Sequence, residues 1–542
     1  MRSGAVPQSP AAGTSGVVSS PHWLASEAGA EILRRGGNAV EAAIAVSSTL
    51  AVVYPHMNGL GGDGYWLVSD GRSGSVQGIA AAGPAGRGYH TGVFPPAGRT
   101  GIPFRGGLAA LTVPGVAGGW DLAYAHSREN WGGRLSWDVL LDRAMGYAAS
   151  GFPVSASQCR ALRDHAGELE GQPGFARHFL RENRLPPGEG TVWAQPDLAR
   201  SLRMIAGEGP QVFYQGRLAR AMVQGLQRAG SRLVEEDLQA YRARWVSPLR
   251  VRFGRGELLN LPPPTQGVAS LMIAAVLDRM DVHRLPPLGA EFVHLAVEVT
   301  KQVFRYRDAL VADPDFQGMT VEHLLTDLSL ERCARSIDRE SAACPPPGGP
   351  ATGDTAWFGV VDASGRMVSA IQSLYHEFGT GVVAGDTGIV WNNRGCAFSL
   401  ETGHANVLAP GKRPFHTLNP AMYAEDGQVR MAYGTMGGDG QPQTQAAVLF
   451  RARRYGWPLA EAISAPRWLY GRTWGEPAAG LRLESRYGRD VAETLQRWGH
   501  AVTWVEPYSD LMGHAGALAC TPDGCCTGAA DPRSDGAAVA AS

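Results

Sequence analysis

A threonine at the start of a strand-like segment, Thr355, is the residue whose position most suggests chemistry. Residues 344–354 before it read CPPPGGPATGD, a run that suits neither a helix nor a central strand. The apolar runs 355–362 and 366–374 flank an Ala-Ser-Gly turn and predict a β-hairpin that is entered from this linker. Cleavage before Thr355 would free an α-amino group with a reference pKa of about 7.7–8.0, which can accept the proton of the neighbouring hydroxyl. The spacing therefore indicates a self-cleaving precursor with an N-terminal threonine nucleophile; a strand-favouring threonine without a catalytic role is the alternative.

Other combinations of residues that carry known chemistry are absent or incomplete. The chain has no G-x-S-x-G elbow of a serine hydrolase, and His376-Glu377 lacks the second histidine of a zinc-binding H-E-x-x-H helix. The glycine-rich turn at residues 61–64 lacks the lysine of a phosphate-binding loop. Cys520, Cys525 and Cys526 cluster without a nearby fourth ligand, and we interpret them as free structural thiols. We expect no metal and no other cofactor.

Helices and strands of recognisable pattern surround these residues. Residues 23–33 have helical periodicity, and Asn38 follows a Gly-Gly stop signal and can cap a second helix over 39–53. Residues 65–69 predict a strand. The middle of the chain is mostly helical in pattern and is broken at 261–267, where three consecutive prolines require an irregular loop.

The composition is that of a folded globular protein. Of 542 residues, 44% are hydrophobic and 18% are charged. The balance of 49 basic and 50 acidic residues gives no reason to expect nucleic acid or an anionic membrane as a partner. No window holds the roughly 18 continuous apolar residues of a membrane helix. Residues 1–18 lack the apolar core of a signal peptide and are expected to form a disordered lead, which favours a cytoplasmic location.

Several segments, taken in order along the chain, resemble the gamma-glutamyltranspeptidase family of N-terminal-nucleophile hydrolases. The matching pieces are residues 32–39, the Gly61-Gly62 turn, the loop at 262–264, Thr355 followed by 360–362, and then 379–385, 388–393 and Gly437-Gly438. The resemblance implies an α+β fold, a four-layer αββα sandwich, with autocatalytic cleavage between Asp354 and Thr355. A large subunit, 19–354, and a small subunit, 355–542, would form one composite domain. The protein would thus be a heterodimer, with a dimer of heterodimers as an open alternative.

The resemblance also implies roles for particular residues. Thr355 would attack the carbonyl of Asp354 during processing and later attack substrate amides, passing through a covalent acyl-enzyme. The backbone N–H groups of Gly437 and Gly438 would form the oxyanion hole, where glycine permits close approach of the substrate. Ser373 would supply a second hydroxyl near the nucleophile. An ordinary turn at the two glycines and a polar strand residue at Ser373 are the alternatives.

The substrate-binding positions depart from those of a gamma-glutamyl enzyme. Residues 79–84 lack the arginine that grips the substrate α-carboxylate in the family, and Ala397 replaces the aspartate that binds the substrate amino group. Tyr375 replaces an asparagine of the glutamyl pocket, and His416-Thr417 replace a pair of serines. Because each charged contact contributes roughly 1.5–3 kcal/mol, we expect gamma-glutamyl transfer to be inefficient.

The replacements suggest a smaller substrate. Arg394, His416 and Thr417 together offer a cation and hydrogen-bond donors to a carboxylate, although Arg394 could instead pair with an internal acid. With residues 393–395 and 434–443, the chain looks like the oxamate amidohydrolase branch of the family, whose members hydrolyse oxamate to oxalate and ammonia in purine breakdown. We therefore predict hydrolysis of a small amide. The alternatives are gamma-glutamyl hydrolysis or transfer on glutathione-type substrates, acylase chemistry on a cephalosporin-type amide, and a non-catalytic homologue.

Overall fold

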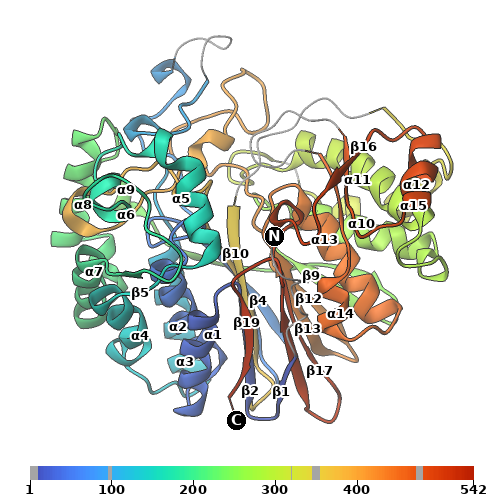
Figure 1. Cartoon of the computed structure of the whole chain (residues 1–542), viewed down its shortest axis with the longest axis horizontal. Helices are drawn as coiled ribbons and strands as arrows, with labels where there is room; N and C mark the ends of the chain where they lie inside the picture. Colours follow the sequence, from blue (N-terminus) through green and yellow to red (C-terminus); the bar gives the residue numbers. More distant parts are fainter. Residues whose placement is uncertain (1–9, 95–100, 319, 345–353, 472–479, 542) are drawn as a thin grey trace.

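Two seven-stranded antiparallel sheets stacked between layers of helices make up the fold (Figure 1). The structure is a computed structural model that describes residues 10–94, 101–318, 320–344, 354–471 and 480–541. Helices cover the outer face of each sheet, so the order of layers is helix, sheet, sheet, helix. The expected α+β, four-layer αββα sandwich is confirmed.

The first sheet contains the predicted hairpin. Its strand order is β19-β2-β10-β11-β3-β4-β7. Strands β10 (Asp354–Asp362) and β11 (Met367–Tyr375) pair with each other at its centre and are flanked by β2 (Gly16–Ser20) and β3 (Asp63–Ser69). The outer strands are β4 (Val76–Ala81), β7 (Arg244–Val246) and β19 (Ala537–Ala540).

The second sheet has the order β1-β18-β17-β13-β12-β9-β8. Its strands are β1 (Ala11–Gly13), β8 (Leu249–Phe253), β9 (Gly256–Asn260), β12 (Ala421–Glu425), β13 (Gln428–Thr435), β17 (Ala515–Cys520) and β18 (Cys526–Ala530). Both sheets therefore combine strands from before and after Thr355. A cut before Thr355 would leave two chains that share both sheets.

The helices divide into two layers. The first sheet is covered mainly by α1 (Trp23–Arg34), α2 (Ala39–Val53) and α3 (Val116–Asn130), with α4 (Trp137–Ser150), α7 (Pro196–Glu208) and α8 (Arg217–Arg228) further out. The second sheet is covered by α10 (Gly267–Arg279), α13 (Gly440–Leu449) and α14 (Leu459–Ser464), with α11 (Ala290–Leu310), α12 (Asp327–Arg335) and α15 (Arg489–Arg497) outside them.

The predicted cap of α2 is confirmed. The Asn38 side chain accepts hydrogen bonds from the N–H groups of Val40 and Glu41, and the Glu41 carboxylate accepts one from the N–H of Asn38. This reciprocal arrangement satisfies N–H groups that a helix start would otherwise leave unpaired. Every residue of α2 is buried, which agrees with a sequence that is apolar except for Glu41, Ser47, Ser48 and Thr49.

Two expectations from the sequence are wrong. The expected disordered lead, residues 1–18, contains β1 and most of β2; residues 1–9 lie outside the described part of the chain. The small residues of β1 and β2 concealed these strands, because only Val17 and Val18 of them are large and apolar, and both are completely buried. Cys520 and Cys526, expected to be free, stand opposite each other across β17 and β18 and form a disulfide, whereas Cys525 is free.

Two further expectations concern the linker and the membrane. Residues 345–353 of the predicted linker lie outside the described residues, and β10 begins directly after them at Asp354. Among the helices of the described ranges, none combines the length and apolar character needed to cross a bilayer.

Candidate active site

The candidate site lies at one end of the gap between the two sheets, where β10 begins. Thr355 is the second residue of β10, its side chain is buried, and its hydroxyl has no hydrogen-bond partner among the described residues. Strand β11 carries an extra residue here: Asp354 pairs with Tyr375 and Ala356 pairs with Gln372, so both residues 373 and 374 stand opposite Thr355. Such a bulge re-aims side chains next to it, a common device at active sites.

Strand alternation brings polar side chains to the same face as Thr355. Trp357 and Ile371 pack between the sheets, and residues two positions along a strand share a face. Ser373, two residues after Ile371, lies on that face and pairs directly with Asp63 on β3. Its hydroxyl accepts a hydrogen bond from the N–H of Tyr375 at 2.7 Å. Three adjacent strands therefore place Thr355, Ser373 and Asp63 in a row.

Arg394 forms the wall of the site beside Asp63. It begins the short helix η7 (Arg394–Ala397) and is completely buried. Its Nε lies 3.5 Å from Oδ2 of Asp63, and its guanidinium carbon lies 4.5 Å from the centre of the Tyr375 ring. Neither Nη1 nor Nη2 has a hydrogen-bond partner among the described residues. Arg394 thus has an internal acidic partner, as one of the two alternatives held, and its two terminal nitrogens stay unpaired within the described part of the chain.

Burial changes the charge balance of this pair. The loss of water raises the pKa of the Asp63 carboxyl to about 7, against the opposing effect of Arg394 and of the nearby N–H groups of Gly83 and Gly115. Those N–H groups lie close to the carboxylate without forming hydrogen bonds of normal geometry. Burial also lowers the pKa of Arg394, and Asp63 partly offsets that effect.

Two asparagines fix the position of Arg394. Oδ1 of Asn392 accepts a hydrogen bond from the N–H of Arg394 at 3.0 Å, and Nδ2 of Asn392 donates to the carbonyl of Gly61 at 2.9 Å. The N–H of Asn393 donates to the carbonyl of Leu374 at 3.1 Å. The arginine is therefore tied both to the turn before Asp63 and to the bulge opposite Thr355.

Loops of the second sheet supply the facing side of the site. His416 packs edge-on against the ring of Tyr65, 5.0 Å between centres. Both ring nitrogens of His416 and the hydroxyl of Thr417 lack hydrogen-bond partners among the described residues. Burial, together with the positive charge of Arg394, lowers the pKa of His416 well below its usual value, so the imidazole is neutral.

A glycine pair follows β13 on the same side. Gly437 and Gly438 have φ angles of +117° and +52°, which favour glycine, and they lie directly before α13. Within the described residues, neither of their N–H groups donates a hydrogen bond. Unpaired N–H groups beside a helix N-terminus are suited to a developing negative charge.

Gln266 connects the glycine pair to the rest of the site. Its Nε2 donates to the carbonyls of Gly438 and Thr417 at 3.0 and 2.8 Å. Its Oε1 accepts a hydrogen bond of 3.0 Å from Nη1 of the buried Arg307, which also donates to Asp439 at 2.7 Å. One side-chain amide thereby holds the His416-Thr417 loop and the glycine loop at a fixed separation.

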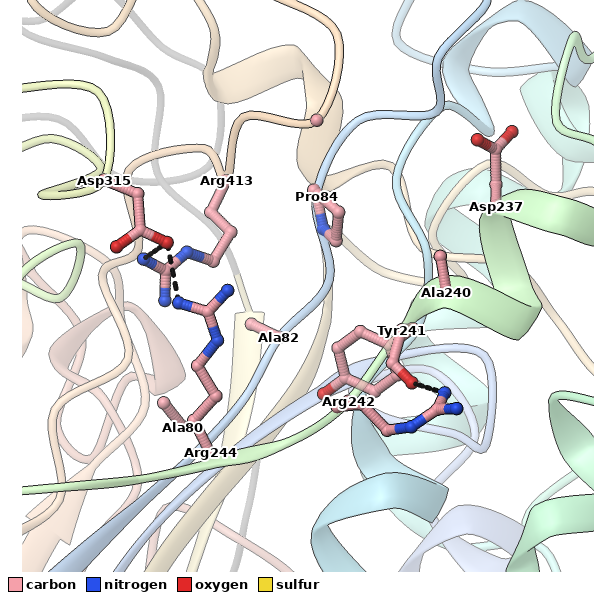
Figure 2. Close-up of a pocket in the computed structure, with 11 residues that line it drawn as sticks. Ala80, Ala82, Pro84, Asp237, Ala240, Tyr241, Arg242, Arg244, Asp315 and Arg413 are labelled. Atoms are coloured by element: carbon pink, nitrogen blue, oxygen red, sulfur yellow. Dashed lines mark hydrogen bonds and ion pairs between the residues drawn. The ribbon is translucent and has the colours of Figure 1, made fainter.

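A small pocket adjoins this site (Figure 2). Its volume is about 100 Å³. Arg244 and Arg413 both pair with Asp315, at 2.6 and 3.2 Å. Figure 2 shows the three side chains meeting at one side of the pocket. The stretch 79–84, where the family that the sequence resembles has its carboxylate-binding arginine, contributes only small side chains to the lining: Ala80, Ala82 and Pro84. Thr355 does not line the pocket; Tyr241, on its wall, lies within electrostatic range of Asp63 and Tyr65.

The structure gathers the sequence-predicted residues at one end of the sandwich, and their roles stay predictions. They are Asp354 and Thr355 on β10, Ser373 and Tyr375 on β11, Arg394 on η7, His416 and Thr417 before β12, and Gly437 and Gly438 after β13.

Sequence reasoning missed Asp63, Gln266 and Arg307. Asp63 interrupts a run of glycines at the start of a strand, and Gln266 lies in the loop of the triple proline. Both are polar residues in segments whose sequence already resembles that of the family. Arg307 carried no such signal, because it lies inside the regular helix α11.

One buried group of metal-ligand type lies elsewhere in the described part of the chain. His294, Glu298 and His500 bring ligand atoms within 4.8 Å of one another. Glu298, however, accepts a hydrogen bond from Lys301 at 2.6 Å, and the two histidines are hydrogen-bonded to each other at 2.8 Å. The group is therefore satisfied internally and has a cation beside it.

Comparison with known proteins identifies the family of the chain. The sequence model of the family described as gamma-glutamyltranspeptidase matches residues 25–541. An oxamate amidohydrolase proenzyme of Klebsiella pneumoniae is 48% identical over 97% of this chain and 98% of its own. A glutathione hydrolase-like proenzyme of Bacillus subtilis, YwrD, is 43% identical over 97% of this chain and 98% of its own.

The fold has a close structural counterpart as well. The crystal structure of a cephalosporin acylase from Bacillus halodurans superposes with a TM-score of 0.90 at 30% identity, covering 100% of this chain and 98% of that one. The family match and these relatives each extend over nearly the whole chain. The chain belongs to the gamma-glutamyltranspeptidase family, and it is a self-processing hydrolase of the N-terminal-nucleophile type.

Proposed function

We propose that this protein hydrolyses a short amide that carries a carboxylate, with oxamate as the leading substrate, to the corresponding acid and ammonia. The observation that carries the proposal is the buried guanidinium of Arg394, whose two terminal nitrogens have no partner among the described residues and which is paired with Asp63, in the row of Ser373 and Thr355. Arginine binds carboxylates in a two-pronged geometry that lysine cannot reproduce. The 48% identity to an oxamate amidohydrolase proenzyme supports the same substrate.

Processing would precede catalysis. We propose that Oγ1 of Thr355 attacks the carbonyl carbon of Asp354, that the peptide nitrogen leaves as the new α-amine of Thr355, and that water hydrolyses the resulting ester. Residues up to 354 would form the large subunit and residues 355–542 the small one. Because both sheets contain strands of both parts, we expect the subunits to remain one heterodimer after the cut.

The same hydroxyl would then act on the substrate. The α-amine of Thr355 takes the proton of Oγ1 as the oxygen attacks the amide carbon, and the protonated nitrogen leaves as ammonia. The acyl group stays on Oγ1 as an ester until a water molecule, deprotonated by the same amine, releases it as the acid. We assign the oxyanion hole to the N–H groups of Gly437 and Gly438, which donate no other hydrogen bond among the described residues.

The remaining polar groups would orient the substrate. Arg394 would bind its carboxylate, with Tyr375 stacked beneath the guanidinium. Thr417 and neutral His416 lack partners among the described residues and would donate to the substrate carbonyl and carboxylate oxygens. Ser373, opposite Thr355, would hold the nucleophile in position. Neither a metal nor a cofactor is needed by this scheme.

Substrate comparison tests the proposal. Ammonia release by the processed protein should be measured in parallel with oxamate, glutamine and other gamma-glutamyl amides, and release of the acyl group with a cephalosporin-type amide. We expect the highest kcat/KM for oxamate, because residues 79–84 provide no arginine for a glutamyl α-carboxylate. A higher kcat/KM for the glutamyl amides or for the cephalosporin-type amide would contradict oxamate as the substrate and would assign that substrate class instead.

A further inference from the structure

Asp63 and a substrate carboxylate would compete for the same guanidinium. Resting on the function proposed above, we propose that Asp63 takes up a proton from solvent when a carboxylate ligand binds Arg394, and that Asp63 thereby sets the pH range over which the site accepts an anion. Asp63 acts through Arg394 and is therefore a positioning and specificity-determining residue.

The geometry of the pair carries the first step. Asp63 approaches Arg394 from the Nε side, at 3.5 Å, and leaves Nη1 and Nη2 unpartnered among the described residues. A ligand carboxylate that engages these two nitrogens would sit on the opposite edge of one small, planar cation. Both side chains are at least 99% buried, so water cannot screen the repulsion between the two carboxylates.

The surroundings of Asp63 carry the second step, because the described residues place no unpaired side-chain cation there that could balance a second negative charge. Arg413, whose charge acts on Tyr65 next to Asp63, is bound to Asp313 at 2.5 Å and to Asp315. Processing would add the α-amine of Thr355 to the same row, and the Asp63→Asn variant separates that group from Asp63. The other titratable side chains that face Asp63 or Arg394 are neutral, since burial raises the pKa of the tyrosines and lowers that of the histidine. These groups are Tyr65 on β3, Tyr375 on β11, Tyr214, Tyr241 and His416.

A proton on Asp63 resolves the imbalance. With Asp63 neutral, Arg394 and the ligand carboxylate form a buried pair of zero net charge, and the protonated Asp63 keeps a hydrogen atom to donate. Burial already raises the pKa of Asp63 to about 7 in the free protein, so the proton is taken up within the physiological range. A second negative charge also develops on the substrate oxygen during the reaction. A neutral Asp63 does not repel this charge and therefore favours its formation as well.

Ligand binding measures this coupling without turnover. Propionate and its neutral counterpart propionamide should be compared as competitive inhibitors of the processed enzyme from about pH 6 to about pH 9. The inhibition constant of propionate should rise about tenfold per pH unit above the pKa of Asp63, and that of propionamide should stay flat. Calorimetric titration with propionate near pH 8 in two buffers of different ionisation enthalpy should show the uptake of close to one proton.

Two variants identify the group that takes up the proton. Asp63→Asn should abolish the proton uptake and flatten the propionate profile. Asp362→Asn is the matched control: Asp362 is also buried, has an arginine at 3.8 Å and a pKa raised by burial, but lies at the other end of β10. Its profile should equal that of the wild type.

Three results would overturn the inference: propionate binding without proton uptake in the wild type, proton uptake that persists in Asp63→Asn, or no inhibition by propionate at any pH. Absence of proton uptake in the wild type overturns the inference even where Asp63→Asn fails to fold or process. Oxamate turnover is a separate measurement. Proton uptake without oxamate hydrolysis would contradict only the proposed substrate, and hydrolysis without proton uptake would contradict only the role of Asp63.

Discussion

Replacing Arg394 by glutamine removes the proposed carboxylate anchor and keeps a neutral hydrogen-bond donor of smaller size. The wild-type guanidinium offers two unpartnered nitrogens in a fully buried site. Each charge-assisted hydrogen bond contributes roughly 1.5–3 kcal/mol, so the pair contributes about 3–6 kcal/mol. At 1.4 kcal/mol per factor of ten, we expect kcat/KM for oxamate to fall by about 10²- to 10⁴-fold.

Oxamide, which carries an amide in place of the carboxylate, separates this anchoring role from general damage to the site. Ammonia release should be measured for oxamate and oxamide with the processed fraction of each protein. We expect the variant to lose far more activity with oxamate than with oxamide. Equal losses for the two substrates, or an oxamate kcat/KM within threefold of the wild type, would refute the assignment of Arg394.

A second buried arginine provides the matched control. Arg451 is also completely buried, burial also lowers its pKa, and its Nε and Nη1 have no partner among the described residues. It lies after α13, where it donates to the carbonyl of Pro466 at 2.8 Å. Arg451→Gln should lower thermal stability and leave kcat/KM for both substrates unchanged.

Gly438→Ala should lower the free energy of unfolding by about 1–2 kcal/mol, because the residue has a positive φ, and should lower kcat about 10²-fold or more, because its N–H serves the oxyanion. The control Gly427→Ala, at φ +73° in an open turn, should show the loss of stability alone. Gln266→Leu should slow processing and lower kcat, because two carbonyls lose their donor; normal kinetics would contradict its holding role. Asp63 binds its proton more tightly in the folded protein than in the unfolded chain, so the wild type loses this contribution to its stability as pH rises from about 4 to about 7. Over that range, the free energy of unfolding of Asp63→Asn in urea should therefore increase relative to that of the wild type. A difference between the two proteins that does not change with pH would contradict this prediction.

Local pattern predicted the elements that carry the nucleophile. The hairpin of β10 and β11 follows from two apolar runs around an Ala-Ser-Gly turn, and the bounds of α2 follow from the Asn38 cap. Both depend on neighbours in sequence. The glycine pair after β13 follows instead from the resemblance to the family, and its positive φ angles favour glycine.

Contacts between distant segments could not be predicted. The ion pair of Asp63 and Arg394 joins residues more than 300 positions apart, and it exists only because β3 pairs with β11 and Asn392 ties η7 to the turn before β3. Composition misled the interpretation of β2, where neighbouring strands rather than large side chains provide the burial. The disulfide of Cys520 depends on the register of β17 and β18, which spacing alone does not define.

The central claim is that Thr355 cuts the chain before itself and becomes the nucleophile. Intact mass measurement of the purified wild type and of Thr355→Ala, after equal incubation, tests it most directly. The account predicts two wild-type chains, with the smaller one beginning at Thr355, and a single uncut chain for Thr355→Ala. A wild-type chain that stays whole, a small chain that begins at another residue, or a processed Thr355→Ala protein would contradict it.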